Sequence, residues 1–152
     1  MSLRVRRATL ADVDALTPLF DGYRQFYGQP GNPLRAHDFL AERLARDESV
    51  IFLAEDTGEV IGFAQLYPTF SSVQTARAWI LNDLFVRRES RHRGAARQLL
   101  SACVDFGRET GAVGLQLETQ RTNTVAQALY VEQGWELDEE FCAFHYPLKE
   151  RG

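Results

Sequence analysis

The densest chemical signal in the sequence is a basic turn at residues 87–97, which holds five arginines and one glutamate. The turn therefore carries a local charge of +4 in a chain whose net charge is −4. Gly94, Ala95 and Ala96 open a predicted helix here, and the first N–H groups of a helix have no partner inside it. These N–H groups, the helix dipole and the arginines together favour a compact polyanion. The acidic remainder of the chain leaves surface for a cationic second substrate.

Two common phosphate-binding loops do not fit this turn. No Gly-Lys-Ser/Thr follows, as a P-loop requires, and the turn has one glycine where a dinucleotide-binding fingerprint has three. A solvated helix start and a nucleic-acid surface are the alternatives for the arginines, and the acidic remainder of the chain disfavours nucleic acid. The histidines and the two cysteines are scattered without metal-ligand spacing, so no metal site is expected.

The elements that position this turn follow from the hydrophobic pattern. It predicts one α/β domain over residues 1–152, with a mixed, mostly antiparallel central sheet flanked by helices. The strands are expected at residues 5–8, 50–54, 60–67, 78–86 and 113–119, with a last strand or hairpin over 135–148. The helices are expected at residues 10–27, 34–47, 94–110 and 123–133. Pro18 should kink or split the first helix near Thr17, and Pro68 should end or bend its strand.

Composition excludes several classes of protein. With 45% hydrophobic and 25% charged residues, the chain is neither disordered, collagen-like nor a disulfide scaffold. No apolar run approaches the ~20 residues of a membrane-spanning helix, and the opening seven residues lack the apolar core of a signal peptide. Only two cysteines occur, and Cys103 falls on the buried side of a predicted helix. A reduced, cytoplasmic setting is expected.

The pattern Arg91-x-x-Gly94-x-Ala96 resembles the signature of the Gcn5-related N-acetyltransferases, the GNAT superfamily. The resemblance spans nearly the whole chain. It also includes Arg6-Arg7-Ala8-Thr9-x-x-Asp12, Val60-Ile61-Gly62-Phe63, Leu84-Phe85-Val86, Leu99-Leu100, Asn123, Ala126, Tyr130 and Gly134-Trp135.

The resemblance implies the GNAT fold and transfer of an acetyl group from acetyl-CoA to a primary amine, without a metal. It implies that backbone groups of Leu84, Phe85 and Val86 bind the acetyl and pantetheine arm and supply an oxyanion site. The residues implied to hold the pyrophosphate are Arg91, His92, Arg93, Gly94, Ala95, Ala96 and Arg97. Asn123 and Ala126 would contact the cofactor, and Asn123 would also cap the following helix. Tyr130 would lie near the thioester sulfur and protonate the leaving thiolate.

A narrower resemblance, carried by Tyr67-Pro68-x-Phe70-Ser71-Ser72 and by residues 81–86, is to the histone/polyamine and diamine acetyltransferases. In the diamine subgroup a glutamate often precedes the aspartate of this strand, and in this sequence Asn82 is at that position. The resemblance therefore does not identify a general base. Asp83 is the candidate for binding a cationic amine or relaying its proton. Glu118 has a weaker claim of the same kind, and the acidic run at residues 138–140 is expected to be a solvated turn.

Several questions stay open at this level. The acceptor is expected to be a small cationic amine or a lysine-like group, with polyamine, aminoglycoside, amino acid, protein N-terminus and lysine all remaining candidates. A catalytically silent acyl-CoA sensor on the same fold is the alternative function. No nucleic-acid or membrane partner is expected, and a homodimer is compatible with the sequence.

Overall fold

The computed structural model describes residues 2–91 and 94–149. The chain divides into two compact units, Met1–Glu118 and Thr119–Gly152. The first unit contains the whole sheet and three α-helices, and the second contains a single helix, α4 (Thr124–Glu132), with the segment that follows it. The expectation of one domain over residues 1–152 stays a prediction.

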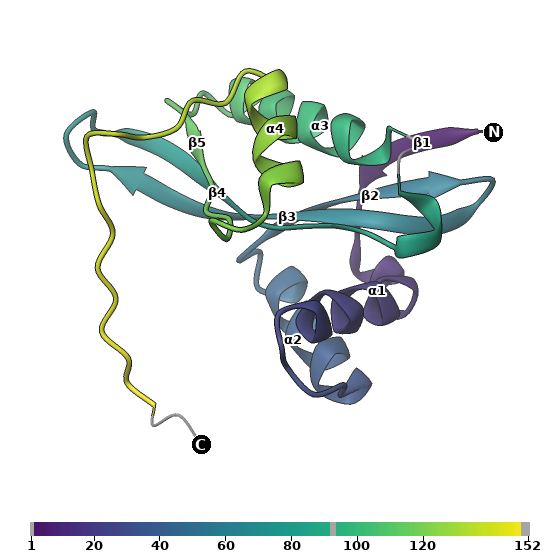
Figure 1. Ribbon diagram of the computed structural model, residues 1–152. Coiled ribbons are helices and arrows are strands. Elements are labelled where there is room, and N and C mark those ends of the chain that lie inside the picture. Colours follow the sequence, from purple (N-terminus) through teal and green to yellow (C-terminus); the bar gives the residue numbers. More distant parts are fainter. Residues whose placement is uncertain (1, 92–93, 150–152) are drawn as a thin grey trace. The chain divides into compact units, whose positions relative to one another are not determined.

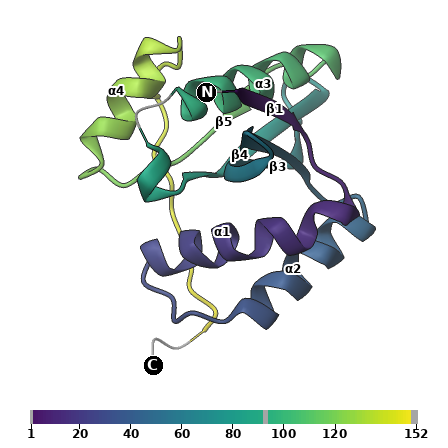
Figure 2. The same ribbon diagram turned by 90° about the vertical axis from the view of Figure 1, so that its right-hand side faces the viewer.

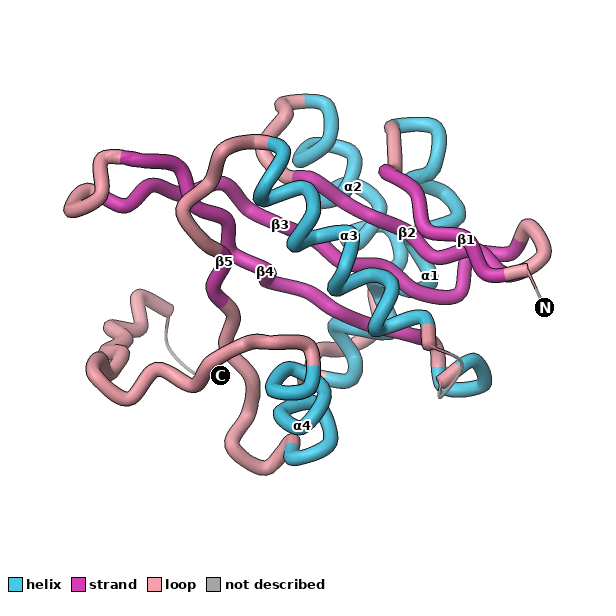
Figure 3. Tube along the Cα trace, turned by 90° about the horizontal axis from the view of Figure 1, so that it is seen from above, coloured by secondary structure: helices cyan, strands magenta, loops and turns pink. Residues whose placement is uncertain are grey.

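The first unit is built on a five-stranded sheet with the strand order β1-β2-β3-β4-β5 (Figures 1 and 3). Neighbouring strands are antiparallel except β4 and β5, which are parallel. The expected mixed, mostly antiparallel sheet is confirmed. The strands are β1 (Leu3–Arg7), β2 (Val50–Asp56), β3 (Glu59–Ser71), β4 (Ala76–Val86) and β5 (Leu115–Gln116).

Helices cover both faces of this sheet. α1 (Val13–Phe26) and α2 (Pro33–Ala45) lie on one face, and α3 (Ala95–Glu109) lies on the other (Figures 1 and 2). Beneath α1 and α2 the core includes Leu16, Leu40 and Phe63, each at most 1% exposed. On α3, Cys103 is fully buried, and burial raises the pKa of its thiol to about 12. Cys103 is therefore a core residue, as predicted, and not a nucleophile.

Neither of the two prolines ends its element. α1 runs through Pro18 without a break, after a short 3₁₀ turn at Leu10–Asp12. Pro18 removes a hydrogen bond only to the carbonyl of Asp14, an exposed residue in the first turn, where water can replace it. β3 likewise continues past Pro68 to Ser71, because β2 pairs with β3 only up to Leu66. Pro68 therefore lies in an edge section of β3, where proline is tolerated.

The end of the chain departs furthest from prediction. β5 contains only two of the seven residues expected to form a strand at 113–119. No helix or strand forms over residues 135–148, so the predicted final strand or hairpin is absent. Within the described residues, no helix is long and apolar enough to cross a membrane. The other predicted elements are present with small shifts at their ends.

Candidate active site

The turn that joins β4 to α3 is shaped by Gly94. This residue is the N-cap of α3 and has a φ of 83°, a left-handed conformation that strains residues with a side chain. A Cβ at this position would meet no atom within 4 Å, so the glycine is required by the backbone and not by crowding. Since glycine has no side chain to cap the helix, the N–H groups of Ala95 and Ala96 face the turn without an N-cap side chain. His92 and Arg93 lie outside the described residues.

Two of the arginines in this turn are engaged in protein contacts. Arg91 donates through Nε to the carbonyl of Val86 at 3.0 Å, and its guanidinium lies 5.7 Å from the ring centre of Phe85. Arg87 donates through Nε to Ser90 Oγ at 2.9 Å and pairs with Glu59. These contacts fix the turn against the end of β4, and Glu59 offsets the charge of Arg87, while Arg91 keeps its charge because its partners are neutral.

β4 loses its strand partner on one side before it reaches this turn. It pairs with β5 only at Trp79 and Ile80, whereas its pairing with β3 continues to Val86. No described strand lies on the β5 side of residues 84–86. Backbone groups of residues 84–86 on that side, apart from the Val86 carbonyl that Arg91 occupies, therefore have no strand partner among the described residues.

Gly62 on β3 allows β4 to approach closely at this same place. It pairs with Val86, and a Cβ on it would lie 2.9 Å from the carbonyl oxygen of Phe85 and 3.1 Å from Val86 Cγ2. Both are closer than ordinary contacts, and the first is to backbone, which has little room to move. Gly62 therefore maintains the close spacing between β3 and the end of β4.

Asp83 precedes the strand end and is enclosed by side chains from three elements. Only 1% of it is exposed. Gln65 donates through Nε2 to Asp83 Oδ2 at 2.6 Å, and Asn82 donates through Nδ2 to Oδ1 at 2.8 Å. Tyr23 of α1 also hydrogen-bonds Asp83, and its hydroxyl donates to the Asn82 carbonyl at 3.0 Å.

The surroundings of Asp83 change the pKa of its carboxyl group. Burial raises the pKa of its carboxyl, while hydrogen bonds from Asn82, Gln65 and Tyr23 oppose the rise. Among the described residues no cation forms an ion pair with it, so neutral donors alone stabilise its charge. Burial and then the Asp83 charge raise the pKa values of Tyr23 and Tyr67, so both phenols stay protonated at neutral pH. Perturbed groups of this kind cluster at functional sites.

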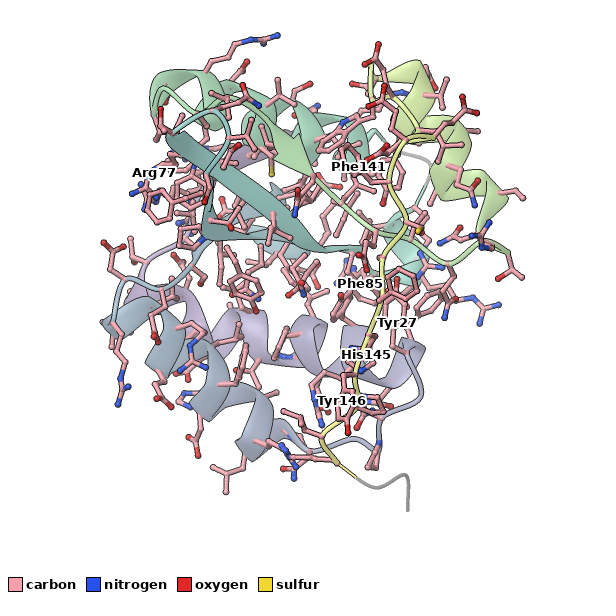
Figure 4. The ribbon with its side chains drawn as sticks, turned by 90° about the vertical axis from the view of Figure 1, so that its left-hand side faces the viewer. Tyr27, Arg77, Phe85, Phe141, His145 and Tyr146 are labelled. Atoms are coloured by element: carbon pink, nitrogen blue, oxygen red, sulfur yellow. The ribbon has the colours of Figure 1, made fainter. Side chains whose placement is uncertain are left out.

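Aromatic rings lie beside this buried carboxyl. The ring of Tyr23 is 6.3 Å from that of Phe85 and 5.1 Å from that of Tyr27, measured between ring centres. Figure 4 shows Phe85 and Tyr27 on the α1 side of the sheet, with Arg77 at the opposite end of β4. Tyr27 is 43% exposed, so part of this aromatic group reaches solvent.

Sequence reasoning missed Gly62, Gln65 and Tyr23. Tyr23 fits the apolar face of its helix, and helical spacing carries no signal that its hydroxyl reaches β4. Gln65 lies in a strand of otherwise apolar residues, and a polar residue inside such a run was a signal available from the sequence. Glu118 is exposed and lies outside β5.

The remaining predicted residues belong to the second unit. Asn123 caps α4, because its Oδ1 accepts from the backbone N–H of Ala126 at 3.2 Å. The predicted capping role is confirmed, while cofactor contacts by Asn123 and Ala126 stay predictions. The ring centre of Tyr130 lies 6.2 Å from that of Trp135. The backbone N–H of Trp135 donates to the Tyr130 carbonyl. Tyr130 is only partly buried.

Comparison with known proteins shows which family has this fold. Residues 16–135 match the acetyltransferase (GNAT) family, and the chain belongs to it. An uncharacterized N-acetyltransferase, YhfO, from Bacillus subtilis (strain 168) is 47% identical over 146 residues, covering 96% of this chain and 97% of the relative. An aminoglycoside N(6')-acetyltransferase type 1 of Salmonella typhimurium (strain LT2) is 29% identical over 114 residues, covering 72% of this chain and 79% of the relative.

Solved structures give the same result for the fold. The crystal structure of a probable acetyltransferase has a TM-score of 0.92 and 43% identity, covering 97% of this chain and 99% of that one. An aminoglycoside N-acetyltransferase in complex with CoA has a TM-score of 0.79 at 24% identity, covering 95% of each chain. The comparisons support an N-acetyltransferase of the GNAT kind. They do not confirm the histone/polyamine and diamine subgroup.

The close approach at Gly62 gives a first prediction. Gly62→Ala should lower the free energy of unfolding by about 1–3 kcal/mol, because the added methyl group forces β3 away from the Phe85 carbonyl. Gly114→Ala is the matched control, since a Cβ there meets no atom within 4 Å and its φ is not positive. Urea denaturation of both variants measures the difference. Equal stability of the two variants would contradict the account of Gly62.

The raised pKa of Asp83 gives a second prediction. The folded protein holds this proton more tightly than the unfolded chain, so the parent should lose stability as pH rises from the ordinary carboxyl pKa of about 3.9 to the folded value. Asp83→Asn removes this titration, and a flipped Gln65 amide can still pair with the new side chain. Urea denaturation at a series of pH values should therefore give a flatter profile for the variant. Parallel profiles would show that Asp83 titrates alike in both states.

Proposed function

We propose that this protein transfers an acetyl group from acetyl-CoA to the amino group of a small cationic acceptor. The observation that carries the proposal is the end of β4. There a strand edge without a strand partner among the described residues is followed by a 3₁₀ turn at Arg88–Ser90 and then by the left-handed Gly94 at the N-terminus of α3. The two features offer backbone donors and acceptors to an extended arm and N–H groups to a pyrophosphate at its end.

The residues of acetyl-CoA binding follow from this arrangement. Backbone groups of residues 84–86 bind the pantetheine arm, and one N–H there stabilises the oxyanion as the thioester carbonyl is attacked. The N–H groups at Gly94, Ala95 and Ala96 hold the pyrophosphate, with charge from Arg91 and Arg97 and, by resemblance, His92 and Arg93. Asn123 and Ala126 contribute from the second unit on the strength of the family pattern.

The acceptor must lose a proton before or during attack. With a pKa near 10.4, an alkyl ammonium ion is neutral in only on the order of one part in a thousand at pH 7. Asp83 has the raised pKa that suits a proton acceptor, but it is almost fully buried. Tyr23 links it to the surface, because its hydroxyl hydrogen-bonds Asp83 and its ring lies against the half-exposed Tyr27. We infer that the amine proton passes to Asp83 through the Tyr23 hydroxyl.

The leaving group needs a proton as well. Attack by the neutral amine forms the C–N bond, and collapse of the intermediate breaks the C–S bond and releases a thiolate. A phenol is protonated at neutral pH and can supply the missing proton. Tyr130 is assigned this role on its place in the family pattern, seven residues after Asn123.

Two observations favour a cationic acceptor. Aromatic rings at Tyr23, Tyr27 and Phe85 attract cations through their faces, and the Asp83 carboxylate adds negative charge behind them. Gln65 Oε1 is also buried without a donor among the described residues. The Salmonella typhimurium relative named for aminoglycosides fits this class, since aminoglycosides carry several amino groups. The polyamine and diamine acceptors suggested by residues 67–72 and 81–86 fit it equally.

The experiment that tests the proposal is a screen for acetyl-CoA-dependent thiol release. The panel contains polyamines, aminoglycosides, amino acids, a peptide N-terminus and lysine peptides. We expect the best acceptor to be cationic and its advantage to weaken with added salt. A best acceptor that is anionic or uncharged would contradict the acceptor class, and acetyl-CoA binding without transfer to any amine would support a sensor instead. The expected cytoplasmic setting is not tested by this screen.

The glycine turn gives a third prediction. Gly94→Asp should raise the dissociation constant for acetyl-CoA at least about 100-fold, because a carboxylate would lie against the pyrophosphate. Gly58→Asp is the matched control: its φ of 81° and its open surroundings equal those of Gly94, but it lies in the β2–β3 turn. Calorimetric titration measures both. If the two variants bind acetyl-CoA equally well, the turn does not hold the pyrophosphate.

A fourth prediction concerns Tyr130. Tyr130→Phe removes one hydroxyl, so acetyl-CoA should still bind while turnover falls by roughly 10²–10⁴-fold. The loss should appear in kcat and kcat/KM together, since the proton is transferred in the transition state. Single-turnover measurements separate this step from product release. A single-turnover rate equal to the parent's would show that Tyr130 only packs beside Trp135 and is not the proton donor.

A further inference from the structure

A cavity lies at the end of β4 that is opposite to the proposed active site. Its volume is about 470 Å³, and small-molecule sites have volumes of roughly 300–1,000 Å³. All the described residues that line it belong to the first unit. Arg77 is one of them, and Figure 4 shows it at the far end of β4 from Phe85. Strand geometry separates these two residues by roughly 25 Å, so the cavity is distinct from the proposed site.

The cavity forms where the sheet extends past the helix that covers it. Phe70 on β3 pairs with Arg77 on β4. Two residues along the strands, Pro68 pairs with Trp79, so all four side chains lie on the same face of the sheet. α3 ends beside this face, where the hydroxyl of its C-cap Thr110 accepts from Trp79 Nε1 at 3.0 Å. Part of the face is therefore left uncovered by α3, and Phe70 is 69% exposed there.

Two arginines in the cavity wall keep their charge and their hydrogen-bonding groups available. The guanidinium of Arg77 lies 5.2 Å from the ring centre of Phe70 and 5.2 Å from that of Trp79. The guanidinium of Arg7 lies 5.2 Å from the ring centre of Phe106. Neither guanidinium forms an ion pair or a hydrogen bond with a described residue. A guanidinium stacked on a ring face still presents its N–H edge, which fits the two oxygens of a carboxylate.

Ser49 adds a polar group without a partner. It lines the same cavity and is only 3% exposed. Its Oγ is buried and has no hydrogen-bond partner among the described residues. A buried hydroxyl without a partner is unfavourable. A ligand oxygen against this wall would remove that cost, because a serine hydroxyl can rotate to donate to it.

We propose that this cavity binds a small carboxylate that carries a flat apolar ring. Its charge selects an anion, because Arg7 and Arg77 outweigh Asp47, the one acid among the described residues of its wall. The two N–H edges and the Ser49 hydroxyl hold the carboxylate oxygens, and the exposed ring of Phe70 packs against the apolar ring of the ligand. The inference goes beyond the proposed function and does not depend on it, because no residue of the proposed site enters it.

Titration of the full chain with benzoate, followed at Trp79, tests the binding. The chain has two tryptophans, so labelling with fluorotryptophan gives two fluorine NMR signals, and a Trp135→Phe variant identifies the one from Trp79. Benzoate should shift the Trp79 signal in a saturable manner. The dissociation constant should be on the order of 1 mM, as expected for so small a ligand. The absence of a saturable shift at Trp79 would overturn the proposal.

Variants of the cavity wall show whether its polar groups hold the carboxylate. Arg77→Gln should weaken benzoate binding at least about 10-fold, because it removes a charge-assisted hydrogen bond. Arg4→Gln is the matched control, since it makes the same change of charge at an exposed arginine of β1 outside the cavity wall. Ser49→Ala should weaken binding about 3-fold without lowering the melting temperature of the free protein, because its hydroxyl has no partner to lose. Equal binding by the Arg77→Gln and Arg4→Gln variants would overturn the proposal.

Two further probes test the class of ligand. Benzylamine has the same ring with a positive charge, and inorganic phosphate has negative charge without a ring. Both should bind at least about 10-fold more weakly than benzoate, because each lacks one of the two features that the cavity recognises. Benzylamine that bound as tightly as benzoate would show that the cavity recognises the ring alone. Phosphate that bound as tightly would show that it recognises charge alone, and either result would overturn a ring-bearing carboxylate as the ligand.

Discussion

The separation of β4 from β5 is the constraint on which the proposed site depends. Two strands that stayed paired along their length would use all of their backbone groups, and none would remain for a ligand. Here the pairing ends after Ile80, while β3 continues to support β4 as far as Val86. An unpaired strand edge is normally a liability. In this protein the edge is followed, after a 3₁₀ turn at Arg88–Ser90, by the N-terminus of α3, and the proposed extended ligand would use both.

The buried Asp83 shows how the same strand serves chemistry on its other side. A carboxylate loses hydration free energy when it is buried, and no described cation compensates for that loss. Three neutral donors hold it instead, one each from α1, β3 and β4. A core that needed only stability would use an apolar residue at this position, because an unpaired buried charge is destabilising. The arrangement is understandable if the carboxyl must accept a proton, and Tyr23 then supplies the connection to solvent.

Sequence reasoning predicted the order of elements, the central β4 and the capping of α4 by Asn123, because these depend on local patterns and on periodicity. The structure shows no split helix at Pro18 and no strand end at Pro68, because the consequence of a proline depends on what faces its missing N–H group. Sequence reasoning was wrong about the final strand, because alternation of the kind seen at Phe144, Tyr146 and Leu148 is necessary for a strand but does not by itself form one. The contacts of Asp83 with Gln65 and Tyr23 join distant parts of the chain, and no spacing within the sequence reveals them.

The sequence overstates how much positive charge the basic turn, residues 87–97, presents to a ligand. Counted in the sequence, five arginines make residues 87–97 strongly positive. In the structure Arg87 pairs with Glu59, and Arg91 donates to the Val86 carbonyl, so both are used to hold the turn against β4. What remains in a fixed orientation is the set of N–H groups that Gly94 leaves uncapped at the start of α3. These groups cannot rotate away from a ligand and lose no side-chain entropy on binding, so in the proposed site they would contribute more to specificity for the anion than the arginines that hold the turn.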